Sequence, residues 1–81
     1  MEIIHHPEEN RFVAVVDGCT AYVEYEKSEQ TFDVVHTIVP SEIGGRGIAG
    51  KLVHAAYSYA DELGLEKRAS CSYAAKWLER H

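Results

Sequence analysis

A cluster of glycines at residues 44–50 separates two halves of this chain that have different hydrophobic periods. Before the cluster, apolar and polar residues alternate, as they do in strands with one buried face. From Ile48 to Leu63, apolar residues recur at the spacing of an amphipathic helix. The chain must therefore place a strand, a glycine-rich turn and a helix in direct succession, and this junction restricts the folds open to it.

Three strands are predicted ahead of the glycine cluster. β-branched residues are frequent at 11–16, and the Asp-Gly pair at 17–18 predicts a hairpin turn, because both positions can take positive φ. We expect the returning strand over 19–26 and a third strand over 31–39, which a proline ends. The start of the chain is either frayed or a short edge strand at 3–4. One face of the third strand is expected to carry Phe32, Val34, His36 and Ile38.

The second half of the chain is predicted to be α-β-α. The helix over 48–63 should end at Gly64, which occupies the C′ position. A short strand is expected over 65–72 and a final helix over 73–80. An antiparallel β-meander followed by α-β-α gives an α+β fold of three-layer-like form, with helices packed on a twisted sheet. A chain of 81 residues should form one domain, 1–81.

The composition of the chain argues against several classes of partner. Its formal net charge of −5 argues against a nucleic-acid partner, because such a partner requires a basic face. No stretch approaches the roughly 18 apolar residues of a membrane span. Two cysteines, Cys19 and Cys71, and no apolar signal segment lead us to expect the reducing cytoplasm. No Cys and His set has zinc spacing, so no metal is expected.

The glycine cluster is a candidate anion site. Unpaired amides at the start of a helix point toward a ligand, the helix dipole favours negative charge, and glycines let a phosphate approach the backbone. The alternative is a loop whose glycines only turn the chain. A Walker A match at 45–51 is weakened by Leu52, which replaces the Ser or Thr that reaches Mg²⁺. A dinucleotide fingerprint at 45–50 is weakened by the antiparallel strands that precede it.

A strand that ends in Val-Pro, a loop, and Gly-Arg-Gly-Ile-Ala opening an amphipathic helix together resemble motif A of the GCN5-related N-acetyltransferases. In that family the consensus Gln/Arg-x-x-Gly-x-Gly/Ala holds the pyrophosphate of acetyl-coenzyme A through its amides. Gly47 and Ala49 match this consensus, whereas Gly44 stands at its Gln/Arg position. The resemblance implies that acetyl-coenzyme A is the co-substrate. Its implied contacts are Ile38, Val39, Gly44, Gly45, Arg46, Gly47, Ile48 and Ala49.

Two further segments resemble a subgroup of very small members of this family. They are 36–40, His-Thr-x-Val-Pro before the loop, and 70–73, Ser-Cys-Ser-Tyr after the helix. The resemblance extends from about residue 11 to the end of the chain. It implies a minimal N-acetyltransferase domain that lacks the N-terminal helices and the final hairpin, which build much of the acceptor site in larger members.

Three residues are candidates for the chemistry of acetyl transfer to an amine, which needs a proton acceptor and polarisation of the thioester carbonyl. His36 could be the base, because imidazole titrates near neutral pH, or it could be satisfied within the sheet. Cys71 resembles a proposed acetyl carrier of the small subgroup. Alternatively, it could be a small apolar residue beside the coenzyme, or a thiol trapped by oxidised coenzyme A. Tyr73 could protonate the leaving thiolate, or it could only pack.

The leading hypothesis is an enzyme that moves an acetyl group from acetyl-coenzyme A to a small-molecule or protein amine. One alternative is a coenzyme A-binding module without turnover, and another is a protein-interaction domain whose glycine turn is structural. An exposed sheet edge leaves both a monomer and a homodimer open.

Overall fold

The computed structural model describes residues 1–81 and contains one five-stranded sheet and two α-helices. Four strands form an antiparallel meander, and the fifth pairs in parallel with the fourth, so the spatial order is β1-β2-β3-β4-β5. The elements are β1 (Ile3–His6), β2 (Arg11–Val16), β3 (Cys19–Lys27), β4 (Thr31–Ile38), α1 (Ile48–Leu63), β5 (Glu66–Ala69) and α2 (Ser72–Arg80), with short 3-10 turns at Pro7–Glu9 and Ser41–Ile43. The predicted α+β fold is confirmed.

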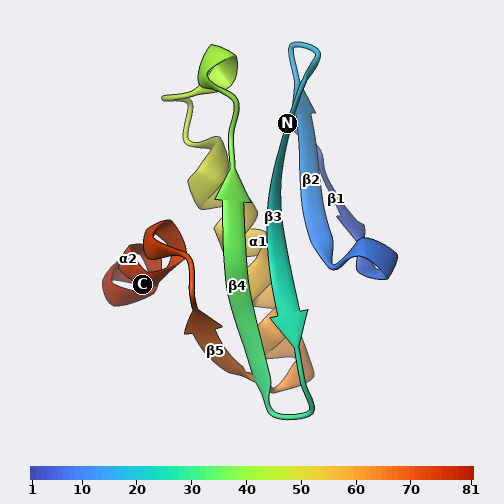
Figure 1. The fold of residues 1–81 in the computed structure, drawn as a ribbon, viewed down its shortest axis with the longest axis vertical. Helices are drawn as coiled ribbons and strands as arrows, with labels where there is room; N and C mark the ends of the chain where they lie inside the picture. The colour runs from blue at the N-terminus through green and yellow to red at the C-terminus, as the bar shows by residue number, and fades with distance from the viewer.

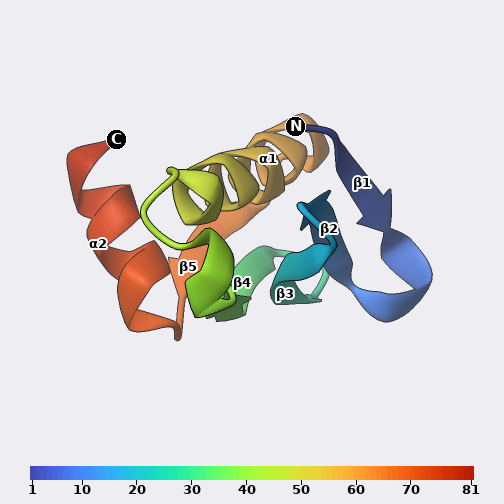
Figure 2. The same cartoon turned by 90° about the horizontal axis from the view of Figure 1, so that it is seen from above.

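The two helices take different places around the sheet. α1 crosses one face and contacts β2, β3, β4 and β5, whereas α2 lies beside β5 at the sheet edge (Figure 1). Figure 2 shows that no helix covers the opposite face. Neither helix is both long enough and apolar enough to cross a membrane.

The core lies between the sheet and α1. β3 contributes Ala21, Val23 and Tyr25, and no polar or charged residue is buried with them. The buried residues of α1 are Ile48, Leu52, Val53, Ala56, Tyr57 and Ala60. Truncating a fully buried leucine such as Leu52 to alanine typically costs about 2–5 kcal/mol. This packing fixes α1 on the sheet and so determines where its N-terminus emerges after β4.

Two of the predicted turn positions adopt left-handed backbone conformations. Asp17 and Gly18, with φ of 50° and 76°, join β2 to β3 in the expected hairpin. Gly64, with φ of 70°, ends α1 and donates its amide to the carbonyls of Ala60 and Asp61. The sequence therefore predicted correctly where β2 folds back into β3 and where α1 stops.

β4 contains a bulge that changes which face its later residues occupy. Glu24 of β3 pairs with His36, whereas the next residue of β3 pairs with Val34. Val35 is therefore an extra residue in β4, and it shifts the alternation of side chains by one. Val34 is buried but His36 and Ile38 are exposed, so the prediction that they share one face was wrong.

The ends of the later elements also differ from the prediction. β4 ends at Ile38, β5 covers only part of the predicted 65–72, and α2 begins one residue earlier than expected. The amides of Ser70 and Cys71 both donate to the carbonyl of Val34, each at 3.1 Å. Because two consecutive amides share one acceptor, the strand ladder stops there and the chain turns into α2.

Candidate functional site

The turn between β4 and α1 has a backbone geometry suited to an anion. Gly45 and Gly47 have φ of 77° and 78°, a conformation that residues with side chains rarely adopt. Gly47 is the N-cap of α1, no side chain caps the helix, and the Lys51 amide donates to the Gly47 carbonyl. The amides of residues 48–50 are thus free of intrahelical partners, and together with the helix dipole they favour a bound anion.

Arg46 carries the only charge of this glycine turn. Its Nη1 donates to Asp17 Oδ2 at 2.6 Å, and the two side chains are 49% and 69% exposed. The guanidinium is therefore directed at the β2–β3 turn. A contact between Arg46 and a ligand at the glycine turn would require this ion pair to open or to be shared.

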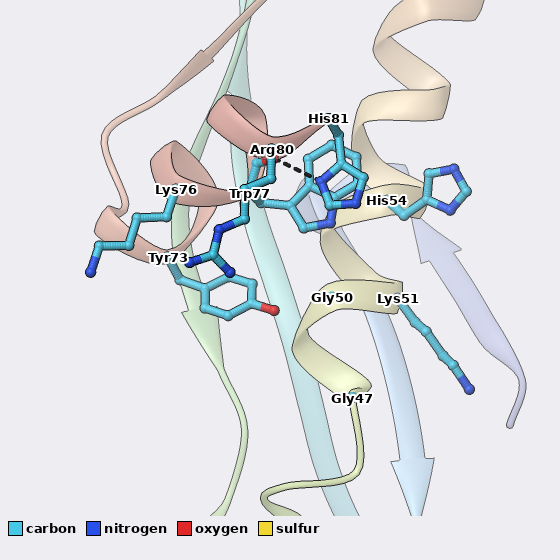
Figure 3. Close-up of a pocket in the computed structure, with 9 residues that line it drawn as sticks. All are labelled: Gly47, Gly50, Lys51, His54, Tyr73, Lys76, Trp77, Arg80 and His81. Carbon is cyan, nitrogen blue, oxygen red and sulfur yellow. Dashed lines mark hydrogen bonds between the residues drawn. The ribbon is translucent and has the colours of Figure 1, made fainter.

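A pocket of about 560 Å³ lies between the N-terminal half of α1 and α2. Figure 3 shows Lys51 reaching out from α1 and Lys76 from α2, with Tyr73 and the guanidinium of Arg80 between them. The lining residues are Gly47, Gly50, Lys51, His54, Tyr73, Lys76, Trp77, Arg80 and His81, none of them acidic. Because Gly47 is also the helix N-cap, the pocket adjoins the free amides of α1.

Positive charge is concentrated in this pocket. Of the eight Lys and Arg residues, four form ion pairs with carboxylates, and Lys27 lies over the ring of Tyr59. The other three, Lys51, Lys76 and Arg80, make no ion pair, and all three line the pocket. In a chain with a net charge of −5, this arrangement suits a ligand with several negative charges.

Aromatic rings form one wall of the pocket. Trp77 stacks on His81 with a centroid distance of 4.1 Å and an interplanar angle of 7°, and on His54 at 5.9 Å. The ring of His81 is also hydrogen-bonded through Nδ1 to the Trp77 carbonyl at 2.9 Å, the dashed line in Figure 3. The Tyr73 hydroxyl lies next to α1, since a Cβ at Gly50 would be 3.3 Å from it. The pocket thus offers planar surfaces beside its positive charges.

β4 and β5 separate at the edge of the sheet next to α2. Their parallel ladder ends at Val34 and Ala69, and the chain then turns away from β4 into α2 (Figure 1). Asp33 fixes the point of separation, because its two carboxylate oxygens accept the amide and the hydroxyl of Ser70, each at 2.7 Å. Past this point β4 remains paired with β3 but no longer with β5, and Cys71 lies across the opening from Thr37.

Cys71 is the N-cap of α2, and its Sγ lies 3.4 Å from Thr37 Oγ1 of β4. Burial alone would raise the pKa of the thiol. Hydrogen bonds from the Thr37 side chain and from backbone groups of Ala74, Tyr73 and Thr37 instead hold the pKa below its usual value. A lowered pKa increases the fraction of nucleophilic thiolate near neutral pH.

The three candidate catalytic residues do not all lie together. Tyr73 lines the pocket and stands two residues after Cys71, at the start of α2. His36 is exposed on the uncovered face of β4, whereas its neighbour Thr37 contacts Cys71. The bulge is the reason, because it turns Thr37 toward the opening and His36 away from it.

The predicted coenzyme contacts lie along the end of β4 and the glycine turn. Ile38 is 45% exposed, and the turn from Gly44 to Gly47 is exposed. The side chain of Ile48 is buried in the core, so only its backbone is available to a ligand. No three His, Cys, Asp or Glu side chains converge in a way that could hold a metal ion.

Sequence reasoning missed the cations and aromatic rings of the pocket, and it missed the roles of Asp33 and Thr37. Lys76 and Arg80 stand one turn apart on α2, which is a usable signal for a shared helix face. No pattern in the sequence indicated where α2 lies relative to α1. The contact between Thr37 and Cys71 depends on the β4 bulge, which the alternation pattern did not reveal.

Comparisons connect this arrangement with known proteins. The profile of the GCN5-related N-acetyl-transferase family matches residues 11–81. The protein NATD1 of Xenopus tropicalis is 31% identical over 84 residues, covering 100% of this chain and 77% of the relative. NATD1 of Mus musculus is 30% identical, covering 100% and 76%. The solution structure of a GCN5-like protein from Staphylococcus aureus matches with a TM-score of 0.73 and 33% identity, covering 98% of this chain and 78% of that one.

Proposed function

Given that the chain belongs to the GCN5-related N-acetyltransferase family, we propose that it binds acetyl-coenzyme A and transfers the acetyl group to an amine. The observation that carries the proposal is the pocket whose lining includes Lys51, Lys76 and Arg80, three cations that form no ion pair with a carboxylate. We place the reaction in the cytoplasm, with a small molecule or a protein side chain as the amine acceptor.

The residues of the pocket fit the charged half of coenzyme A. That half carries a diphosphate and a separate 3′-phosphate on an adenosine, and such groups are held by Lys and Arg side chains and by free helix amides. Lys51, Lys76 and Arg80 supply the side-chain charges, and the amides of 48–50 adjoin the same pocket at Gly47. A volume of about 560 Å³ lies within the usual range for ligand pockets.

The neighbouring residues have tasks that follow from their positions. When bound, acetyl-coenzyme A supplies an acetyl group activated as a thioester. Cys71 is suited to act as the nucleophile, because hydrogen bonds lower the pKa of its thiol and so favour the thiolate. The Tyr73 hydroxyl, which lies beside Gly50, can protonate a leaving thiolate. His36 can accept a proton from an amine that approaches from the uncovered face of the sheet.

One observation favours a second candidate function, a coenzyme A-binding module without turnover. His36 is the only candidate base, and it lies on the other side of β4 from the Thr37 and Cys71 contact. A bound thioester beside Cys71 would then have no general base on its own side. Incubation with acetyl-coenzyme A and a set of amines separates the two functions, because only an enzyme yields acetylated amine.

Titration calorimetry with coenzyme A tests the proposal through the pocket cations. The double variant Lys76→Ala and Arg80→Ala should weaken binding by about 10- to 100-fold, because two charge-assisted contacts are lost. The matched control is Arg11→Ala with Arg68→Ala, which removes the same charge from two ion-paired residues outside the pocket. The dissociation constant of this control for coenzyme A should stay within about twofold of that of the original chain. Equal weakening by both double variants would overturn the assignment of the pocket.

A further inference from the structure

The Thr37 side chain makes the one side-chain hydrogen bond of Cys71. Its Oγ1 lies 3.4 Å from Sγ, although the two residues are 34 positions apart in the chain. Thr37 faces the same side of the sheet as α1 only because the bulge at Val35 inverts the alternation of side chains along β4. As a result, Thr37 pairs with the buried Val23 of β3. The bulge thus places a hydroxyl at the mouth of the β4–β5 opening, opposite the thiol.

Several groups surround the Cys71 thiol from the elements packed against it. Tyr57 of α1 is an ionisable neighbour, but its hydroxyl donates to the Arg68 carbonyl at 2.7 Å, and burial and the nearby charges of Asp33 and Cys71 raise its pKa. Asp33 of β4 accepts two hydrogen bonds from the turn before Cys71. Tyr73 contributes a backbone hydrogen bond from α2. None of these side chains hydrogen-bonds to the sulfur, so the Thr37 hydroxyl is the side chain best placed to orient it.

We propose that Thr37 is a positioning residue for acyl transfer through Cys71, which its hydroxyl holds in the opening as an oriented thiolate. This inference rests on the proposed function. In the first step the Cys71 thiolate attacks the carbonyl carbon of acetyl-coenzyme A, the new carbon–sulfur bond forms, and the coenzyme leaves as a thiolate. In the second step an amine attacks the acetyl-cysteine, loses a proton to a base, and releases the Cys71 thiolate.

A hydroxyl suits this task because it can bond to both forms of the sulfur. When Cys71 is a thiol, its S–H donates to Thr37 Oγ1. When Cys71 is a thiolate, the Thr37 O–H turns and donates to the sulfur. The second bond is the stronger one, because its acceptor is charged. Removing the hydroxyl should therefore destabilise the thiolate more than the thiol.

Two variants separate this role from simple packing. Thr37→Val keeps the shape of the side chain and removes the hydroxyl, whereas Thr37→Ser keeps the hydroxyl and removes a methyl group. A packing role predicts that Val is tolerated and Ser is the more damaging change. The positioning role predicts the reverse, since only Ser can donate to the thiolate.

The first readout is alkylation of Cys71 by iodoacetamide as a function of pH, followed by peptide mass spectrometry without added coenzyme. Thr37→Val should slow alkylation of Cys71 at pH 7 by about fivefold, the effect of one hydrogen bond, and move its pH midpoint upward. The alkylation rate of Cys71 in Thr37→Ser should stay within about twofold of that in the original chain. Cys19 in the same molecule serves as the internal reference, because its alkylation should not change.

The second readout is the rate at which acetyl-coenzyme A acetylates Cys71, measured beside the dissociation constant for coenzyme A. Thr37→Val should slow acetylation by at least the same factor while the dissociation constant stays within about twofold. Equal alkylation of Cys71 in the original chain and Thr37→Val would overturn this inference alone. Failure of the original chain to bind coenzyme A would overturn the proposed function, and the acyl-transfer role of Thr37 with it, even where the alkylation rates differ as expected.

Thr37→Ala supplies a second hydroxyl-free variant in case Thr37→Val fails to fold, as judged by circular dichroism and thermal melting. A folded Thr37→Ala should show the same slow alkylation as expected for Val. If both hydroxyl-free variants unfold, Thr37 is a structural residue and the positioning role is overturned.

Discussion

The guanidinium of Arg46 is bound to the carboxylate of Asp17 at 2.6 Å, which joins the glycine turn to a hairpin turn 29 residues earlier in the chain. Both side chains are largely exposed to solvent, so the pair itself should contribute less than about 1 kcal/mol to stability. Its larger consequence concerns the ligand, because Asp17 competes with any phosphate for the only charge of the glycine turn.

Releasing Arg46 should therefore strengthen coenzyme binding. Asp17→Asn removes the carboxylate charge that pairs with Arg46, and asparagine tolerates the left-handed conformation of this turn position. We therefore expect about two- to fivefold tighter binding of coenzyme A. Arg46→Ala should weaken binding by about 1 kcal/mol or less. Titration calorimetry measures both. If neither variant changes the affinity, Arg46 has no part in binding, and the predicted contact is wrong.

Gly47 allows a test of the phosphate cradle with a close internal control. Gly47 and Gly64 both have left-handed φ, 78° and 70°, and at neither would a Cβ meet any atom within 4 Å. Alanine at either position should thus cost a similar amount of stability, about 1–2 kcal/mol. Only Gly47 adjoins the pocket, so Gly47→Ala should also weaken coenzyme A binding, and Gly47→Val should abolish it.

Thermal melting and calorimetry on the two alanine variants separate backbone strain from ligand contact. Gly64→Ala, at the opposite end of α1, should bind coenzyme A with nearly the original affinity. Equal affinities for Gly47→Ala and Gly64→Ala, with Gly47→Val also binding, would remove the phosphate-cradle interpretation.

His5 makes the stability of the fold depend on pH. Its ring stacks on Phe12 at 4.0 Å, and its Nε2 is hydrogen-bonded to the Tyr25 hydroxyl at 2.7 Å. Burial lowers the pKa of His5, as does the charge of Lys27, while Glu8 opposes them. As pH falls below 6.5, the unfolded chain gains a proton at His5 before the folded chain does. The free energy of unfolding should therefore fall as the pH is lowered from 6.5 through the depressed pKa.

Urea unfolding across this pH range, with His5→Gln as the comparison, measures the effect. Glutamine can still hydrogen-bond to Tyr25 but does not titrate, so its free energy of unfolding should depend less steeply on pH below 6.5. Identical slopes for the original chain and His5→Gln would show that His5 does not control the pH dependence.

Local signals in the sequence were enough to predict most of the fold. The Asp-Gly pair, the period change at the glycine cluster and Gly64 each specify a conformation through their own residues. The bulge at Val35 has no such signal, since an extra residue in a strand looks like ordinary alternation until its partner strand is known. For this reason His36 was assigned to the wrong face, and the place of Thr37 at the opening was not foreseen.

The candidate site was only partly predictable for a related reason. The glycine turn is continuous in sequence, so its place at the start of α1 was foreseen. The pocket combines Lys51 of α1 with Lys76 and Arg80 of α2, and their proximity depends on how α2 packs beside β5. A side-chain set assembled from separate helices by tertiary packing leaves no periodic trace in one sequence.

The separation of His36 from Cys71 leads to the last prediction, which divides acetyl transfer into two measurable steps. The first step, from acetyl-coenzyme A to Cys71, requires the thiolate but no base on the uncovered face. In the second step an amine attacks the acetyl-cysteine and loses a proton to a base. His36 can be that base only for an amine that enters the opening from the uncovered face.

Cys71→Ala should bind coenzyme A normally yet lose amine acetylation by about 10²-fold or more. His36→Ala should acquire one acetyl group on Cys71 at the original rate and then pass it to amines about 10²-fold more slowly. Cys19→Ala, which removes the other thiol, should change neither step.

Intact-protein mass spectrometry follows the acetylation of Cys71, and analysis of the acetylated amine follows the second step. Full amine acetylation by Cys71→Ala would mean that the acetyl group moves directly from coenzyme to amine, and slow acetylation of Cys71 in His36→Ala would mean that His36 reaches the opening after all.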